Sequence, residues 1–233
     1  MTSLAQADIE RAVLKRGWLA HQSPDFQRAV RQRARLVSLH AGEHVFHVGD
    51  ATGGVYGVVS GGVGVLIPGL GSALRLAQVL RAGVWFGHGP IMTGRARVLG
   101  FRATEPSLAL HAPMAALQEI AASQPAWARA VGSLSDFSID IAIAAVSDLL
   151  IPDSARRLAA VLLRAAVLDM DNPPAKPVLL GLRQSEIAEM ANLSERMVGR
   201  ILKQFEASGW VETGYGALML ADPKALRAFA AED

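Results

Sequence analysis

Two apolar patterns at helical spacing, separated by a short break, lie between Leu182 and Glu212. In the second pattern, apolar side chains recur at i, i+3, i+4 and i+7, as on one face of an α-helix: Val198, Ile201, Leu202 and Phe205. The break falls at residues 192–194, where Ser194 is a good N-cap and Glu195 complements the helix dipole. The pattern therefore predicts two short packed helices, the second of which ends at Gly209.

After the second helix the chain reads as a β-hairpin. The strings WVE at 210–212 and ALML at 217–220 are strand-like, and the turn TGYG at 213–216 joins them. A helix–turn–helix followed by such a wing is a geometry that reads DNA. The alternative is a solvated helix face on a small α/β domain, which the charge of residues 153–233 favours, with 10 basic and 11 acidic residues. The ordered combination of break, spacing and hairpin favours DNA binding.

The face of the second helix that lies opposite its apolar stripe carries Arg196, Gly199, Arg200 and Lys203. Arginine bound through two hydrogen bonds to guanine is the commonest specific base contact. We therefore expect Arg196 and Arg200 to read bases. Glu195 could accept a hydrogen bond from cytosine N4.

Between about 36 and 112 the pattern changes to short apolar strings separated by Gly and Pro. Examples are VYGVVS, VGVLI and LALHA. Short strands with frequent turn residues predict an all-β sandwich or barrel. His44 and His47 lie three residues apart, so we expect them on opposite faces of one strand.

From about 113 to 151 turn residues become rare and helical spacing returns, with two apolar stripes. One stripe contains Trp127, Val131, Leu134, Ile141 and Ala145, and the other contains Ile139, Ile143, Val146 and Leu150. A helix with two apolar stripes must bury two faces. The second face packs either on another copy of the chain, which we favour, or within one chain. Pro152 ends this helix, and Asp153 or Ser154 can cap the next one.

Composition narrows the classes of function. The 233-residue chain is 51% hydrophobic and carries 23 basic and 21 acidic residues, so a nucleic-acid surface must be a local patch. It has no cysteine, which excludes disulfides and cysteine-held iron–sulfur clusters. No apolar run reaches the roughly 18 residues that span a bilayer, so we expect a cytoplasmic protein with no membrane partner. We find neither a nucleophile–base pair that would suggest an enzyme nor spaced ligands that would suggest a metal site.

This order of parts resembles the Crp/Fnr family of bacterial transcription regulators. GEHVFHVGDATGGVYGVVSGGVGVLI resembles the entry to that family's β roll, and LSERMVGRILKQFEASGWVE resembles its recognition helix. The resemblance implies an α+β fold. It consists of a jelly-roll, cyclic-nucleotide-binding-like sensor domain at 1–118, with N-terminal helices; a long dimerisation helix and hinge at 119–152; and a winged helix-turn-helix at 153–233. It also implies a homodimer on a near-palindromic site in double-stranded DNA, with RNA polymerase as a candidate partner.

The resemblance also assigns residues to DNA. Arg183 and Ser194 match phosphate contacts, and Glu195, Arg196 and Arg200 match base-reading positions. The whole predicted surface is Arg183, Gln184, Ser194, Glu195, Arg196, Met197, Gly199, Arg200 and Lys203. The family often has Arg-Glu where this chain has Glu195-Arg196, which leaves the preferred DNA site open. Leu182 stands where the family commonly has a Thr cap, so we expect a less well capped first helix.

The family's phosphate-binding cassette is only partly present in WFGHGPIMTGRARVLGFRATE. Gly87 is kept, His88 replaces the Glu, and Arg97-Val98 aligns with Arg-(Ser/Thr), so the hydroxyl is lost. Positions that would face the base fall near Ala142 and Ile143, which cannot hydrogen-bond to an adenine. Because a lost donor to a buried charged oxygen costs about 1.5–3 kcal/mol, we predict that cyclic AMP is not the ligand.

Three alternatives stay open for the sensor: another ligand, no ligand, or haem or a metal held by histidines of the β region. Those histidines are His40, His44, His47, His88 and His111. We expect no cofactor. For the whole protein the main hypothesis is a DNA-binding regulator. The alternatives are a regulator that does respond to a cyclic nucleotide, haem or other small molecule, and a scaffold protein whose winged helix contacts proteins.

Overall fold

The computed structural model describes residues 12–51, 53–69, 71, 73–166 and 176–232. The chain divides into two compact units. One comprises residues up to 63 together with 80–141, and the other comprises 64–79 together with 142 onward. Each unit has its own buried core.

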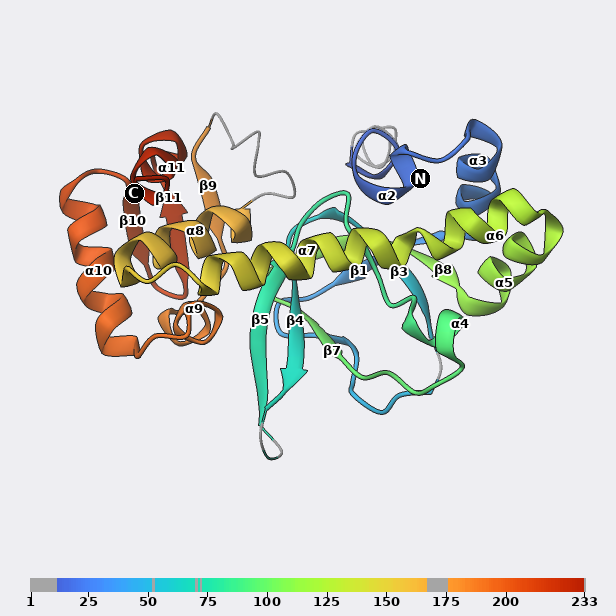
Figure 1. Ribbon diagram of the computed structural model, residues 1–233, viewed down its shortest axis with the longest axis horizontal. Coiled ribbons are helices and arrows are strands. Elements are labelled where there is room, and N and C mark those ends of the chain that lie inside the picture. Colours follow the sequence, from blue (N-terminus) through green and yellow to red (C-terminus); the bar gives the residue numbers. More distant parts are fainter. Residues whose placement is uncertain (1–11, 52, 70, 72, 167–175, 233) are drawn as a thin grey trace. The chain divides into compact units, whose positions relative to one another are not determined.

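Two four-stranded sheets form the β roll, as the apolar strings predict (Figure 1). The first sheet has the order β1-β8-β3-β6, from β1 (Arg35–Leu39), β8 (Ser107–Pro113), β3 (Gly54–Ser60) and β6 (Trp85–Phe86). The second has the order β2-β7-β4-β5, from β2 (His44–Phe46), β7 (Gly100–Ala103), β4 (Val63–Pro68) and β5 (Leu74–Leu80). The predicted β region is therefore confirmed, except that a short helix, α4 (Gly89–Thr93), lies within it.

Helices cover one face of the first sheet. They are α2 (Gly17–Ala20), α3 (Pro24–Arg33), α5 (Met114–Ser123) and α6 (Pro125–Gly132). Trp18 and Trp85 are almost fully buried there, with ring centroids 5.4 Å apart. Gly57 makes room for the Trp85 ring, since a Cβ at that position would lie 2.5 Å from it. The Trp18 indole donates to Ala130 O at 2.8 Å, which ties the N-terminal helices to α6.

The opposite face of the same sheet carries a row of cross-strand neighbours. Arg35 pairs with His111, His111 with Tyr56, and Tyr56 with Phe86. Phe86 also contacts Phe46 and Phe101 of the second sheet, with ring centroids 6.0 and 4.5 Å apart. Aromatic side chains thus fill this end of the roll. Such rings pack at these separations with a gain beyond their buried area.

His44 and His47 do not lie on opposite faces of one strand, contrary to the expectation from their spacing. Strand β2 ends at Phe46 and its register with β7 is irregular. Because His47 has already entered the turn that leads to Asp50, the two imidazole rings stack at 4.3 Å.

A long helix follows the roll. Helices α6 and α7 (Leu134–Leu149) adjoin around Ser133. Val131 and Leu134, from the first predicted stripe, are 3% and 1% exposed within the core of their unit. The second stripe is exposed, with values from 54% to 74% for Ile139, Val146, Ile143 and Leu150. The first predicted face is therefore buried in this chain at Val131 and Leu134 and half-buried at Trp127, Ile141 and Ala145, whereas the second face is exposed.

The same helix qualifies as a membrane span by length and composition alone, over Pro125–Leu149. The sequence nevertheless has no uninterrupted apolar run of that length, because polar residues interrupt this helix. Asp136 and Asp140 lie within it, and charged groups at the centre of a bilayer are costly. An amphipathic helix that packs on protein along one face passes the same test, so the finding is weak evidence for a membrane.

The second unit contains the predicted winged helix. Its helices are α8 (Ser154–Ala166), α9 (Gln184–Ala191), α10 (Glu195–Ala207) and α11 (Pro223–Ala230). Asp153 caps α8, because its Oδ1 accepts from the N–H groups of Ala155 and Arg156. The wing strands β10 (Val211–Gly214) and β11 (Ala217–Leu220) pair antiparallel around a turn of two residues rather than four. A third strand, β9 (Val178–Leu180), which the pattern did not predict, pairs with β11.

Candidate nucleic-acid interface

The turn between α9 and α10 depends on two local features. Asn192 takes a left-handed conformation, φ 50°, which ends α9. Asparagine tolerates this conformation better than most residues. Ser194 then caps α10, since its Oγ accepts from the Met197 N–H at 3.2 Å. The break predicted at 192–194 is therefore a helix C-cap at Asn192 and an N-cap at Ser194, with Leu193 between them.

Helix α10 is buried on one side and exposed on the other. Its predicted core residues are 0–3% exposed: Val198, Ile201, Leu202 and Phe205. The opposite side exposes Glu195, Arg196, Arg200 and Lys203, with Met197 and Gly199 half-buried beside them. The described part of the chain thus presents one basic, solvent-facing side of this helix. Among its contacts, Arg200 Nη2 touches the Met197 Sδ.

The N-terminus of α9 approaches the same surface. Gln184 is exposed, and a Cβ added to Gly199 would lie 3.4 Å from its Oε1. Glycine at 199 therefore lets α9 and α10 come close at this point. The nine predicted DNA-binding residues all lie in this helix–turn–helix unit, on α9, α10 or their N-caps.

Helix α9 has an N-terminal cap despite Leu182. The Glu186 carboxylate accepts from the Arg183 N–H at 2.9 Å and lies 3.6 Å from its guanidinium. Arginine has no acceptor, so only this half of a capping box can form. Leu182 is 2% exposed in the core of the unit, which is the physical reason for an apolar residue at that place.

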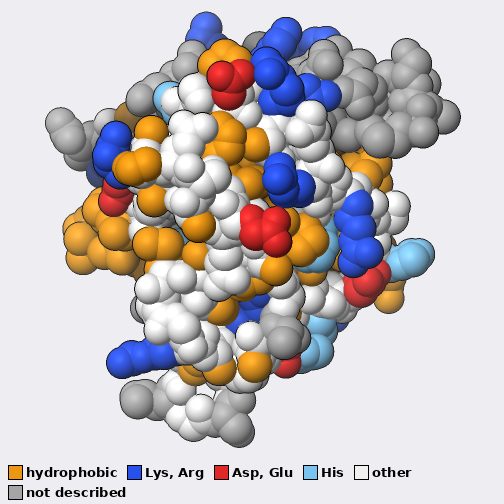
Figure 2. All heavy atoms as spheres, turned by 90° about the vertical axis from the view of Figure 1, so that its right-hand side faces the viewer, with side chains coloured by type: hydrophobic (Ala, Val, Ile, Leu, Met, Phe, Trp, Pro, Cys, Tyr) orange, Lys and Arg blue, Asp and Glu red, His pale blue; other side chains and the backbone are white. Residues whose placement is uncertain are grey.

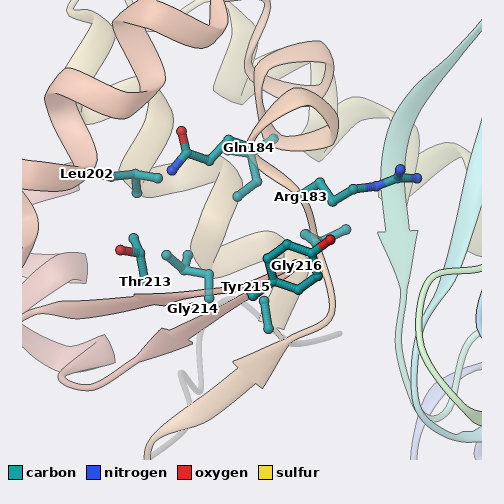
Figure 3. A pocket seen from close by; sticks show the side chains of 11 residues that line it. Arg183, Gln184, Leu202, Thr213, Gly214, Tyr215 and Gly216 are labelled. Carbon is teal, nitrogen blue, oxygen red and sulfur yellow. The ribbon is translucent and has the colours of Figure 1, made fainter.

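A pocket of about 210 Å³ opens between the two helices and the wing (Figure 3). Gln184 and Leu202 border it on the helix side, and Thr213 to Gly216 border it on the wing side. Tyr215 at the wing tip is fully exposed. The Arg183 guanidinium points away from Gln184 and Leu202 in this view.

Glu206 anchors the wing to the recognition helix, a role that the sequence pattern did not reveal. Its Oε1 accepts from the Thr213 N–H at 2.9 Å and also from the Thr213 hydroxyl. These two hydrogen bonds to Thr213 lower the pKa of the Glu206 carboxyl. The sequence carries no specific signal for this contact. Many sequences have an acidic residue near the end of a helix and a hydroxyl residue in the next strand.

Arg97, the predicted phosphate contact of the sensor, is 4% exposed and bound to the backbone of the roll. Its Nη1 donates to Gly87 O at 3.0 Å and its Nη2 donates to Gly54 O at 3.1 Å. Its guanidinium carbon lies 3.6 Å from the centre of the Phe46 ring. A phosphate at this place would have to draw on a guanidinium that is already engaged.

The other predicted effector residues belong to different elements. His88 is half-buried at the start of α4 (Gly89–Thr93), whereas Val98 is 68% exposed. Ala142 and Ile143 lie on α7 in the second unit, where both are exposed. The structure brings Gly87 and Arg97 into contact and shows no such contact for Val98.

Burial lowers the pKa of His88 and also that of His111, where Arg35 and Arg97 add to the effect. Nδ1 of His88 and both ring nitrogens of His111 are buried without a hydrogen-bond partner among the described residues. Within that part of the chain, no group of three His, Cys, Asp or Glu residues is arranged to hold a metal ion.

Basic side chains also occur on the face that Figure 2 shows, where Lys and Arg lie beside acidic and apolar side chains. Arg28 of α3 pairs with Asp25 at 3.2 Å on an exposed surface.

Comparison with known proteins identifies both parts of the chain. Residues 36–124 match the cyclic nucleotide-binding domain and residues 156–229 match the Crp-like helix-turn-helix domain. The chain belongs to the Crp/Fnr family. This family comprises transcription regulators that bind DNA and are not enzymes. No curated protein matches the sequence significantly.

Solved structures share the fold of this Crp/Fnr regulator at low identity. A protein described as cyclic nucleotide binding, from Ruegeria pomeroyi, has a TM-score of 0.72 at 18% identity over 100% of both chains. FixK2 from Bradyrhizobium japonicum has 0.70 at 19% identity, covering 86% of this chain and 98% of its own. A Crp/Fnr regulator from Thermus thermophilus has 0.64 at 20% identity, with 85% and 99% covered.

Proposed function

We propose that this Crp/Fnr regulator binds a near-palindromic site in double-stranded DNA as a homodimer, with α10 in the major groove. The exposed side of α10 carries the proposal, because Arg196 and Arg200 protrude from a helix whose other side is fully buried. Two-fold symmetry would place the half-sites about 34 Å apart. In this arrangement Arg183 and Ser194 contact phosphates, and Gln184 lies at the same DNA surface.

The dimer uses the bare stripe of α7. Ile139, Ile143 and Val146 are each more than half exposed and recur at i, i+4 and i+7. An apolar stripe of this kind on a helix is costly in water and is buried when it meets its own copy. Ile143 therefore serves the dimer rather than a ligand.

The sensor does not use cyclic AMP in this proposal. Arg97 is occupied by Gly54 and Gly87, and Val98 supplies no hydroxyl. Aromatic rings of both sheets fill the roll at this end. Regulation then rests on another ligand, on a partner protein such as RNA polymerase, or on the abundance of the regulator. The protein would act in the cytoplasm, where its DNA is found.

The deciding experiment is selection of bound duplexes from a random double-stranded DNA library, followed by titration of the selected duplex at several salt concentrations. We expect a palindromic consensus and a slope of several units in log K against log salt. Weak binding without a consensus would contradict the proposal and favour a winged helix that contacts proteins.

A further inference from the structure

Among the described residues of the exposed α10 surface, Met197 is the one with a large apolar side chain. It lies in the first turn of the helix, directly after Glu195 and Arg196, with its N–H capped by Ser194. The side chain is half-buried: it packs against the core of the unit, and its sulfur reaches the Arg200 guanidinium. Residues at the N-terminus of a recognition helix are the ones that reach base edges.

We propose that Met197 reads the methyl group of a thymine beside the guanine that Arg200 reads. This rests on the proposed function, and specifically on α10 entering the major groove. In the major groove only thymine presents an apolar group, its C5-methyl, and apolar side chains recognise it. A thioether has no hydrogen to donate and only weak acceptor capacity, so Met197 cannot read the polar edges of the other bases well.

The spacing of Met197 and Arg200 along α10 supports contacts with two neighbouring base pairs. Met197 and Arg200 are three residues apart, so they adjoin on the helix surface. Three residues correspond to a rise of about 4.5 Å. One base step is about 3.4 Å. With Arg200 on a guanine, the Met197 side chain therefore lies over the next base pair.

The Arg200 contact gives Met197 a defined position. A methionine has three rotatable bonds in its side chain and adapts to many surfaces. Here its stem packs on the core and its sulfur touches the guanidinium, which limits that freedom. A carboxylate at this place would bind Arg200 and withdraw it from guanine. The thioether is a weak acceptor that takes one hydrogen of Nη2 and leaves the other donors of the guanidinium available.

The test replaces each thymine of the selected half-site, one at a time, by deoxyuridine, which removes only the methyl group. The guanine that Arg200 reads is the one whose replacement no longer affects binding in Arg200→Ala. For the wild-type protein we expect deoxyuridine at the thymine beside that guanine to weaken binding about fourfold. In Met197→Ala the same replacement should change nothing. Met92→Ala, an exposed methionine in α4 of the other unit, is the matched control and should respond as the wild type does.

A second variant separates loss of base reading from loss of folding. Met197→Gln keeps the length of the stem and should unfold at a similar temperature. Because glutamine pairs with adenine through two hydrogen bonds, selection with this variant should replace that thymine by adenine. The proposal is wrong if no thymine is sensitive in the wild type, or if Met197→Ala stays sensitive. A wild type that selects no consensus would instead overturn DNA reading by α10 itself.

Discussion

The guanidinium Nε of Arg164, in α8, lies 2.5 Å from the Oδ2 of Asp148, at the end of α7. Arg164 is buried and Asp148 is largely so, with side chains 7% and 13% exposed. Arg164 Nη1 also donates to Gln78 in β5 at 3.1 Å. Burial raises the pKa of Asp148, and the hydrogen bond and charge of Arg164 oppose that rise. The pair thus joins the long helix to the first helix of the DNA-binding domain.

Removing one partner of this pair leaves a buried charge without compensation. We expect Asp148→Ala to lower the free energy of unfolding by about 3–5 kcal/mol. Asp140→Ala, on the same helix but exposed, should stay within about 0.5 kcal/mol of the wild type. Denaturant titration of both variants measures the difference. Equal effects would show that Arg164 finds another partner or water.

Arg200 lies on the exposed side of α10, so its loss should affect DNA and not folding. Arg200→Ala should weaken binding to the selected duplex by about 1–3 kcal/mol and leave the midpoint of thermal unfolding unchanged. Arg28→Ala, on the exposed surface of α3, is the matched control, and its binding should equal that of the wild type. Unchanged affinity of Arg200→Ala would contradict the assignment of α10 as recognition helix.

The bare stripe of α7 predicts a dimer that a charge can disrupt. Ile143→Asp should shift the protein from dimer to monomer, since the carboxylate would have to enter an apolar interface. Light scattering after size-exclusion chromatography measures the mass. Met92→Asp, which also adds a charge at an exposed apolar position, should leave the dimer intact. A wild type that is monomeric at every concentration would contradict the prediction.

Cyclic AMP should not stabilise the protein. A ligand with a dissociation constant of about 10 μM would add roughly 2.7 kcal/mol at about 1 mM. We expect no change in the thermal midpoint, because Arg97 is engaged by Gly54 and Gly87. A clear rise would mean that Arg97 leaves those carbonyls for the phosphate. The visible spectrum of the same sample tests for haem.

Acid should destabilise the sensor through His111 and His88. Burial holds both pKa values below the usual 6.5. At acidic pH the unfolded chain therefore binds more protons at these two histidines than the folded chain does. Stability is therefore unaffected by them above pH 6.5 and falls as the pH drops below it, by up to about 1.4 kcal/mol per pH unit for each histidine. Denaturant titrations between pH 7.5 and 5.5 should show a smaller fall in His111→Leu than in wild type. An identical fall would mean that His111 gains a partner on protonation.

The helix-turn-helix could be predicted from the sequence because its signals are local. The spacing of Val198, Ile201, Leu202 and Phe205 defines a buried face, and the remaining side chains of α10 must then face solvent. The cap at Ser194 acts within its own turn. The two stripes of the long helix follow from the same periodicity.

Contacts between distant segments could not be predicted in this way. Strand β9 exists because β11 offers it an edge, and the stacking of His44 on His47 follows from where β2 ends. Leu76 N–H donates to Glu189, 113 residues away, and no local pattern marks either residue.

The sequence by itself determined the long strand-rich and helical regions and the apolar side of the recognition helix, because periodicity and capping act over a few residues. Only the tertiary structure decided what the buried charged groups do. Arg97 is bound to carbonyls of the roll instead of facing a ligand, and Arg164 is paired with Asp148. The reason is physical: a buried charge takes the partners that folding brings within hydrogen-bond distance, and those partners come from remote parts of the chain.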